Sequence, residues 1–197
     1  MKKNKLILEE GYKKVVMTFL ISIALLLFIS DFLGYIGLTL SIIILYIYRA
    51  GYRHIFKNTQ SVLAPIDSTI TAIDEKNGKY KIYCKVGLSD NHLFRAPIDS
   101  EMIVKKYRRG LNLNPHTYKA SLYNEQIVLK FNDLKIKLIS GLFNHKMKRI
   151  KEGNIEQGDK VSVFLDGLVI ITIPKNNKLL VKIDDKLISG QTVLYKV

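Results

Sequence analysis

The sequence predicts a mainly β protein that carries a two-helix membrane hairpin at its N-terminus. Residues 15–47 are almost entirely apolar, whereas residues 61–197 alternate apolar and charged side chains in short runs. Alternation with a period of two is typical of half-buried strands, and a long unbroken apolar run is typical of a membrane segment. Two segments of the β region also occur twice, which indicates duplicated hairpin units.

The apolar run at 15–47 contains one charged residue, Asp31. A bilayer core takes about 20 helical residues, so this run is too long for a single upright span. Asp31, with Gly34 and Gly37 close by, divides it into two predicted helices at 15–30 and 32–48. The alternative is one tilted span, which would place the β domain on the other side of the membrane.

Basic residues flank both ends of the predicted hairpin, so the positive-inside rule places both ends in the cytoplasm. We therefore expect a basic cytoplasmic N-terminus at 1–14, a transmembrane helical hairpin at 15–48, a basic linker at 49–60 and a β domain at 61–197. This topology predicts the bacterial inner (cytoplasmic) membrane as the location, with the soluble domain facing the cytoplasm.

The composition indicates the class of partner. The formal net charge is +14, which favours an anionic partner. Because a membrane anchor is predicted, membrane phospholipid is the expected partner, either phosphatidylserine or another anionic lipid, and nucleic acid is not. The one cysteine, Cys84, excludes an internal disulfide and is expected to be an apolar filler in a strand.

The β region contains six predicted strands and no predicted helix. Turn residues such as Asn77-Gly78 and Asp166-Gly167 separate them, and they lie at 79–86, 125–131, 134–139, 161–165, 169–173 and 179–183. The segment Ala-Pro-Ile-Asp-Ser occurs at 64–68 and again at 96–100. The same offset aligns 152–161 with 184–193 and places Gly158 on Gly190.

The loop at 87–100 holds the chemically most informative residues. Asp90, His92 and Arg95 bring an acid, a base and a fixed cation together within six residues. Histidine has the only side chain among them with a reference pKa near neutrality, which suits proton transfer. The four histidines of the chain lack the spacing of a metal-binding motif, so no metal site is predicted.

These residues resemble the motifs of the phosphatidylserine decarboxylase family, in its short bacterial and archaeal branch. Segment 64–68 resembles the family's Ser-Pro-Ala-Asp-Gly box. Segment 90–97 resembles its Asp-x-His-x-Asn-Arg-x-Pro box, with Phe94 where asparagine is usual. Lys119-Ala120-Ser121 followed by Asn124-Glu125 matches a third box, and the resemblance covers nearly the whole chain. It implies a membrane-anchored β domain that acts in phospholipid metabolism.

The resemblance also implies a chemistry. In this family a serine attacks the carbonyl group of the preceding glycine, and the chain cleaves itself to leave an N-terminal pyruvoyl group. The ketone of that group forms a Schiff base with the amine of the serine headgroup and accepts electrons during decarboxylation. By this resemblance Asp67 and His92 match the catalytic positions, and Arg95, Asn124 and Glu125 are the expected substrate-binding residues.

The processing site departs from the family pattern. The expected Gly-Ser pair falls at Gly167-Leu168, and leucine offers neither a nucleophile nor a leaving group. The pyruvoyl cofactor is therefore not expected. The leading hypothesis is an unprocessed, catalytically impaired relative that binds an aminophospholipid or a partner enzyme, with either homo- or hetero-oligomers.

Two alternatives stay open at this point. The first is an active phosphatidylserine decarboxylase that makes phosphatidylethanolamine with an unrecognised electron sink. The second is a biotinyl- or lipoyl-like adaptor domain, which the Gly158/Gly190 repeat suggests. Such a domain presents a lysine at a hairpin tip, and Lys146-Met147-Lys148 is the nearest match.

Overall fold

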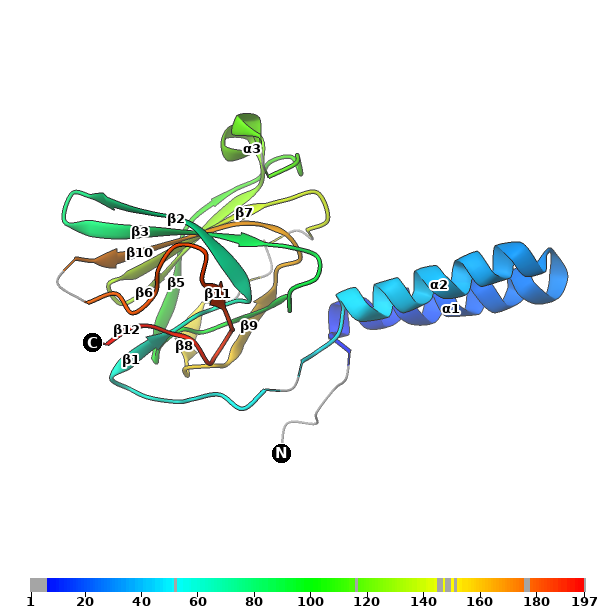
Figure 1. Cartoon of the computed structure of the whole chain (residues 1–197), viewed down its shortest axis with the longest axis horizontal. Helices are drawn as coiled ribbons and strands as arrows, with labels where there is room; N and C mark the ends of the chain where they lie inside the picture. The colour runs from blue at the N-terminus through cyan, green and yellow to red at the C-terminus, as the bar shows by residue number, and fades with distance from the viewer. Residues whose placement is uncertain are drawn as a thin grey trace. The chain divides into compact units, whose positions relative to one another are not determined.

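The computed structural model describes residues 7–51, 53–115, 117–144, 147, 150, 152–175 and 178–196. The chain divides into two compact units, Met1–Tyr52 and Arg53–Val197 (Figure 1). The first unit holds the helices α1 (Glu9–Phe28) and α2 (Asp31–Ile47), and the second holds the strands. The predicted class, mainly β with an N-terminal helix pair, is confirmed.

The two helices pack through small residues. Ser22 and Ser41 are buried between them with their hydroxyl oxygens 3.4 Å apart, and a Cβ on Gly37 would lie only 2.6 Å from the Ser22 Oγ. By length and composition α1 is able to cross a membrane, whereas α2, at 17 residues, is shorter. The helix α1 begins earlier than predicted, because Glu9 and Glu10 in its first turn favour a helix start.

An eight-stranded antiparallel sheet organises the second unit, in the order β11-β2-β3-β10-β7-β6-β5-β8. Two short antiparallel ladders, β1–β12 and β4–β9, accompany it. The strands are β1 (Ser61–Leu63), β2 (Ser68–Lys76), β3 (Lys79–Val86), β4 (Leu93–Arg95), β5 (Ser100–Arg108), β6 (Gln126–Phe131), β7 (Leu134–Ser140), β8 (Gly153–Ile155), β9 (Lys160–Val163), β10 (Gly167–Pro174), β11 (Lys186–Leu187) and β12 (Val193–Lys196).

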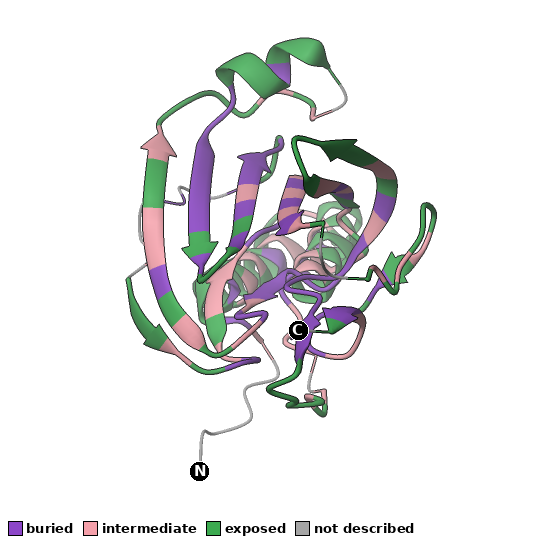
Figure 2. Ribbon diagram, turned by 90° about the vertical axis from the view of Figure 1, so that its left-hand side faces the viewer, coloured by how far each residue is buried: buried purple, intermediate pink, exposed green. Residues whose placement is uncertain are grey.

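One face of the sheet forms the core. Along β10 every second residue is buried, from Gly167 to Ile173, and the residues between them are partly exposed. Figure 2 shows the same alternation of buried and less buried positions along other strands. Cys84 on β3 is fully buried there, and burial raises the pKa of its thiol to about 12. It is therefore an inert core residue, as the sequence predicts.

The sheet consists of two halves with the same internal order. The half β11-β2-β3-β10 meets the half β8-β5-β6-β7 at the β10–β7 pair, so equivalent strands lie in mirrored order about that pair. The accompanying ladders also correspond, because both shift register at matching places, Val62/Leu63 and Phe94/Arg95. Strands β4 to β9 all stand between β3 and β10 in the chain. The second half is thus inserted into the first.

The repeated segments make equivalent hydrogen bonds in the two halves. The Asp67 carboxylate accepts from the Ser189 amide at 2.8 Å, and the Asp99 carboxylate accepts from the Gln157 amide at 2.6 Å. The glycine after each donor residue also donates to the alanine that begins the repeated segment. The Gly190 amide donates to the Ala64 carbonyl at 2.9 Å, and the Gly158 amide donates to the Ala96 carbonyl at 2.8 Å. The prediction of duplicated units is confirmed at this level of detail.

Three features of the β unit differ from the sequence prediction. A short helix, α3 (Tyr118–Tyr123), is present, and the Thr117 hydroxyl caps it by accepting from the Ala120 amide. The predicted strand at 179–183 is wrong, because only Leu179 forms a β-bridge. After it the Asp185 carboxylate accepts from the Lys182 amide and bends the chain into a turn. Seven strands were not predicted: β2 and β5, whose second halves are filled by charged residues, and the short strands β1, β4, β8, β11 and β12.

Candidate functional site

The candidate site lies at one end of the central strands of the sheet, where β3 and β7 end and β10 begins. Gly167 at the start of β10 pairs with Val86 on β3 and with Ser140 on β7. The loop that carries His92 follows β3 directly, and β4 then returns the chain to pair with β9. This pairing brings the loop beside the segment that precedes β10.

His92 is fully buried in that position. Its Nε2 atom lies 3.1 Å from the carbonyl oxygen of Gly87, and its own carbonyl oxygen accepts from the Phe164 amide at 2.9 Å. His92 also lies close enough to Asp166 to act on its carboxyl group electrostatically. Burial raises the pKa of Asp166, while the Phe143 and Leu142 amides and the charge of His92 act in the opposite direction. The structure thus brings the predicted base close to the predicted processing turn.

Hydrogen bonds fix the Asp166–Gly167 turn tightly. The Asp166 carbonyl oxygen accepts from the Gly141 amide at 3.0 Å and from the Asn144 Nδ2, and the Asp166 carboxylate accepts from the Phe143 amide at 3.0 Å. Gly167 has φ of +136°, and a Cβ there would collide with the carbonyl oxygen of Ile139. Only glycine suits this position.

The Leu168 side chain lies on the outer face of the sheet. Gly167 faces the core and Leu168 is the next residue of the strand, so the two residues point to opposite faces. Leu168 pairs there with Lys85 of β3 and Ile139 of β7.

Asp67 is buried at the start of β2 and forms an ion pair with Arg53. Arg95 lies close to both: burial lowers the pKa of its guanidinium group, the like charge of Arg53 adds to this, and Asp67 opposes it. The Arg95 Nη1 donates to the Gly158 carbonyl at 2.8 Å. The sequence analysis missed Arg53, because it lies in a segment assigned to a linker. The one feature of the sequence that could have indicated Arg53 was its positive charge close to the start of the β domain.

Ser189 connects Asp67 to the His92 loop. Its amide donates to Asp67, and its hydroxyl lies within donating distance of the carbonyl oxygens of Pro65 (3.0 Å) and Leu93 (3.4 Å). Leu93 directly follows His92. The predicted catalytic residues Asp67 and His92 therefore belong to one connected region, and Asp67 reaches it through Ser189.

Asn124 and Glu125 lie beneath α3, where both support neighbouring loops. The Asn124 amide nitrogen donates to the carbonyls of Leu113 (2.8 Å) and Ser140 (2.6 Å), and its oxygen accepts from the Leu113 amide (2.9 Å). The Glu125 Oε1 accepts from the Tyr107 hydroxyl (2.6 Å) and the Met147 amide (3.2 Å). In this structure both side chains hold the backbone around the site.

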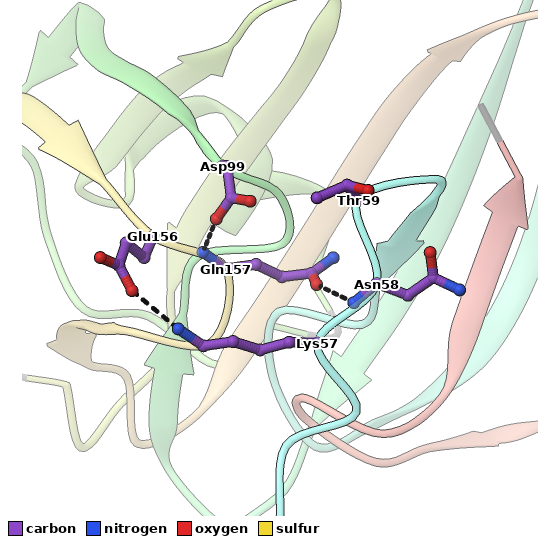
Figure 3. A pocket seen from close by; sticks show the side chains of 6 residues that line it. All are labelled: Lys57, Asn58, Thr59, Asp99, Glu156 and Gln157. Atoms are coloured by element: carbon purple, nitrogen blue, oxygen red, sulfur yellow. Dashed lines mark hydrogen bonds and ion pairs between the residues drawn. The ribbon is translucent and has the colours of Figure 1, made fainter.

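A separate open pocket of about 560 Å³ lies in the other half of the sheet (Figure 3). It contains Asp99, the counterpart of Asp67, and the Lys57–Glu156 ion pair at 2.7 Å. None of the predicted site residues lines it. Its lining residues are Lys57, Asn58, Thr59, Asp99, Glu156 and Gln157.

Two other sequence interpretations bear on the site. The described residues contain no group of three or more His, Cys, Asp or Glu side chains arranged to hold a metal ion. Of the lysine-methionine motif, Lys146 and Lys148 lie outside the described residues, whereas Met147 is buried and belongs to the core.

Comparisons with known proteins agree with the resemblance in the motifs. The family model for phosphatidylserine decarboxylase matches residues 40–195. The chain is 28% identical to the phosphatidylserine decarboxylase proenzyme of Pelagibacter ubique, over 95% of each chain. It is 27% identical to that of Rickettsia typhi, over 96% of this chain and 90% of the relative. It is 24% identical to that of Geotalea uraniireducens, over 98% and 97%. No solved structure matches the chain.

Proposed function

Because the chain belongs to the phosphatidylserine decarboxylase family, we propose that it is a membrane-anchored, unprocessed and catalytically impaired member of that family. Its role is to bind an aminophospholipid headgroup or a partner enzyme of phospholipid metabolism. The observation that carries this proposal is Leu168 after Gly167, since no serine follows a glycine anywhere in the chain.

The residues at the processing turn do not fit a pyruvoyl group. That group forms from a serine, and Leu168 has no heteroatom on its side chain. The strand register supports the same conclusion, because position 168 faces outward beside Lys85.

The remaining charges suit a headgroup. Two guanidinium groups, Arg53 and Arg95, lie beside the buried Asp67 carboxylate, and the charge of Asp159 also acts on Arg95. Guanidinium groups bind phosphate and carboxylate in a planar, two-point geometry. A phosphatidylserine headgroup contains both acceptors.

The membrane anchor has its own test. The helix α1 is long and apolar enough to span a bilayer, and salt does not weaken apolar insertion. We expect the full chain to fractionate with the bacterial inner membrane and to resist extraction by high salt. Release of the full-length protein by salt alone would contradict the anchor without affecting the assignment to the family.

The decisive experiment on processing is intact mass spectrometry of the purified full chain. We expect one uncleaved mass, no reaction with a hydrazide that labels ketones, and no carbon dioxide from phosphatidylserine. A protein that is already split next to Gly167 would overturn the proposal.

Leu168→Ser supplies the missing hydroxyl, with Leu168→Ala as the matched control. Because position 168 faces outward, we expect most of the Leu168→Ser protein to remain uncleaved. A hydroxyl misplaced by ~1 Å can cost about 100-fold in rate, so the expected product is a minor fraction that accumulates slowly. Complete cleavage of Leu168→Ser would mean that the leucine alone blocks processing.

A second candidate is an active decarboxylase that makes phosphatidylethanolamine. The observation in its favour is that the similarity to phosphatidylserine decarboxylase proenzymes extends over nearly the whole of both chains. This candidate requires an electron sink other than the Gly167-Leu168 position. Formation of phosphatidylethanolamine by the uncleaved chain would establish it, and His92→Ala should then abolish the activity.

A further inference from the structure

The outer face of the sheet is strongly basic. The register aligns Lys81, Thr172 and Lys135 in one row across β3, β10 and β7, and Tyr83, Ile170 and Lys137 in the next. Strands β6 and β5 continue the same face toward the edge of the sheet. Besides Lys79 at the end of β3, seven basic residues occupy this outer face: Lys81, Lys85, Lys106, Arg108, Lys130, Lys135 and Lys137.

Carboxylates are confined to the margins of this face. Asp74 lies on β2, opposite Lys81, and Glu101 lies on β5 where that strand pairs with β8. Among the described residues, none of the seven basic side chains forms an ion pair with a carboxylate. Lysines elsewhere in the unit do so: Lys57 pairs with Glu156 and Lys175 with Glu75.

Lys137 lies at the centre of the basic face and is half-buried. Burial lowers its pKa, and the positive charges of Arg108, Lys135, Lys106 and Lys81 lower it further. The backbone hydrogen bonds of the sheet hold these residues on adjacent strands, so the chain cannot separate the like charges. An anion brought to this face would neutralise several of them together.

Apolar side chains lie between the basic ones. Leu168 and Ile170 on β10 are partly exposed, and Val128 and Ile139 on the neighbouring strands are nearly covered. Lysine and arginine stems extend over such surface while their charged ends reach outward. The face thus combines a shallow apolar floor with a surplus of positive charge.

We propose that this outer sheet face, centred on Lys137, is a docking surface for anionic phospholipid headgroups at the membrane surface. The proposal rests on the proposed function only in taking the β unit to be held at a membrane by its helices. Anionic lipid suits the face better than single-stranded nucleic acid, because Tyr83 is the only aromatic residue among the outward-facing paired positions of β3, β10, β7, β6 and β5.

The test uses the full chain in lipid nanodiscs. One set contains phosphatidylcholine alone. The other contains phosphatidylcholine with about 30% phosphatidylglycerol, which gives a strongly anionic surface. Lysine acetylation, read by mass spectrometry, measures the accessibility of each lysine. We expect Lys81, Lys130, Lys135 and Lys137 to be protected only in the anionic nanodiscs, and this protection to disappear at high salt.

Charge-removing variants locate the surface. The test variant is Lys81→Gln/Lys135→Gln/Lys137→Gln. The control, Lys178→Gln/Lys182→Gln/Lys196→Gln, removes the same charge from exposed lysines outside the five strands. Each basic residue near an anionic surface contributes about fivefold to binding, so the test variant should dock about 100-fold less favourably. Protection of Lys130, which both variants retain, should then vanish in the test variant and persist in the control.

Three results would overturn the proposal. Equal lysine protection in both kinds of nanodisc would show that docking does not depend on lipid charge. Equal loss of protection in the test and control variants would show that docking does not use this face. Protection by added RNA without protection by anionic nanodiscs would assign the face to nucleic acid instead. Failure of the chain to enter neutral nanodiscs would contradict the proposed anchor alone, and acetylation with anionic vesicles would then decide the docking surface.

Discussion

The two halves of the sheet differ most in how equivalent strands are connected. In the second half, β6 runs into β7 through two residues, Asn132 and Asp133, with Asn132 at φ of +50°. In the first half the equivalent strands, β3 and β10, are separated by residues 87–166, which contain the second half. His92, Asp166 and Gly167 collect at this opening. The candidate site thus lies where the chain of the first half is interrupted by the inserted second half.

The two copies also differ in what surrounds their common aspartate. Asp67 and Asp99 make the same backbone hydrogen bond, so the geometry is shared. Asp67 is buried against Arg53, whereas Asp99 is exposed in an open pocket. The same backbone therefore holds a charge pair in one copy and a solvated carboxylate in the other.

The largest expected effect is that of Asp67→Asn. It leaves Arg53 and Arg95 without their shared carboxylate, so we expect a loss of about 2 kcal/mol in the free energy of unfolding. The matched change, Asp99→Asn, should cost less than about 0.5 kcal/mol because its carboxylate is exposed. Urea unfolding of the full chain in detergent, followed by circular dichroism, measures both. Equal losses would mean that the two aspartates are energetically equivalent.

A smaller difference is expected between the two repeated glycines. Gly158 and Gly190 have φ of +87° and +74°, so alanine is strained at either position by about 1 kcal/mol. A Cβ on Gly158 would also lie 2.6 Å from the Ile55 Cγ2, whereas on Gly190 the nearest Ile55 atom is 3.4 Å away. Gly158→Ala should therefore cost about 2 kcal/mol, twice as much as Gly190→Ala.

Thermal unfolding of the two glycine variants provides the measurement. Repeating them in an Ile55→Ala background is the control, because it removes the side chain that a new Cβ meets. The two glycine substitutions should then cost the same. A difference that persists without the Ile55 side chain would place its origin in the backbone.

The smallest expected effect concerns pH. Burial raises the pKa of Asp166, so the folded state favours its neutral form. The stability that this form contributes is complete below the ordinary pKa of about 4 and is lost as pH rises through the raised value. Asp166→Asn stays neutral and keeps an oxygen for the Phe143 amide, so its stability relative to the wild type should rise between about pH 4 and 7, by less than about 1 kcal/mol.

Asp133, at the equivalent turn of the second half, is exposed and gives the reference substitution. We expect Asp133→Asn to change stability by less than about 0.5 kcal/mol at pH 7. Unfolding curves of both variants between about pH 4 and 7 test the difference. A stabilisation by Asp166→Asn that is the same across this range would rule out ionisation as its cause.

Much of the fold could be predicted from the sequence, because its signal is local. Strands β3 and β7 alternate apolar and charged residues over most of their length, and β6 and β10 are short apolar runs bounded by turn residues. The identical segments at 64–68 and 96–100 also predicted the duplication. At 179–183 the same apolar pattern misled, because the Asp185 carboxylate competes for the backbone and forms a turn.

The arrangement of the site was less accessible to sequence analysis. His92 lies near Asp166 because β4 pairs with β9, and no local pattern indicates that pairing. Arg53 lies in a segment without a strand pattern, so nothing marked it as the partner of Asp67. The outward direction of Leu168 likewise follows from the register of β10, which only the assembled sheet defines.

Because one half is inserted into the other, the strands of the first half cannot all pair until the end of synthesis. Strands β1 to β3 leave the ribosome first, yet their partners β10 to β12 are the last strands made. The inserted half can pair its own strands β4 to β9 while β1 to β3 still lack their partners β10 to β12 and expose unpaired strand edges. Such long-range pairing is slow and exposes strand edges to aggregation. The nascent domain should therefore depend most on chaperones just before its C-terminus emerges.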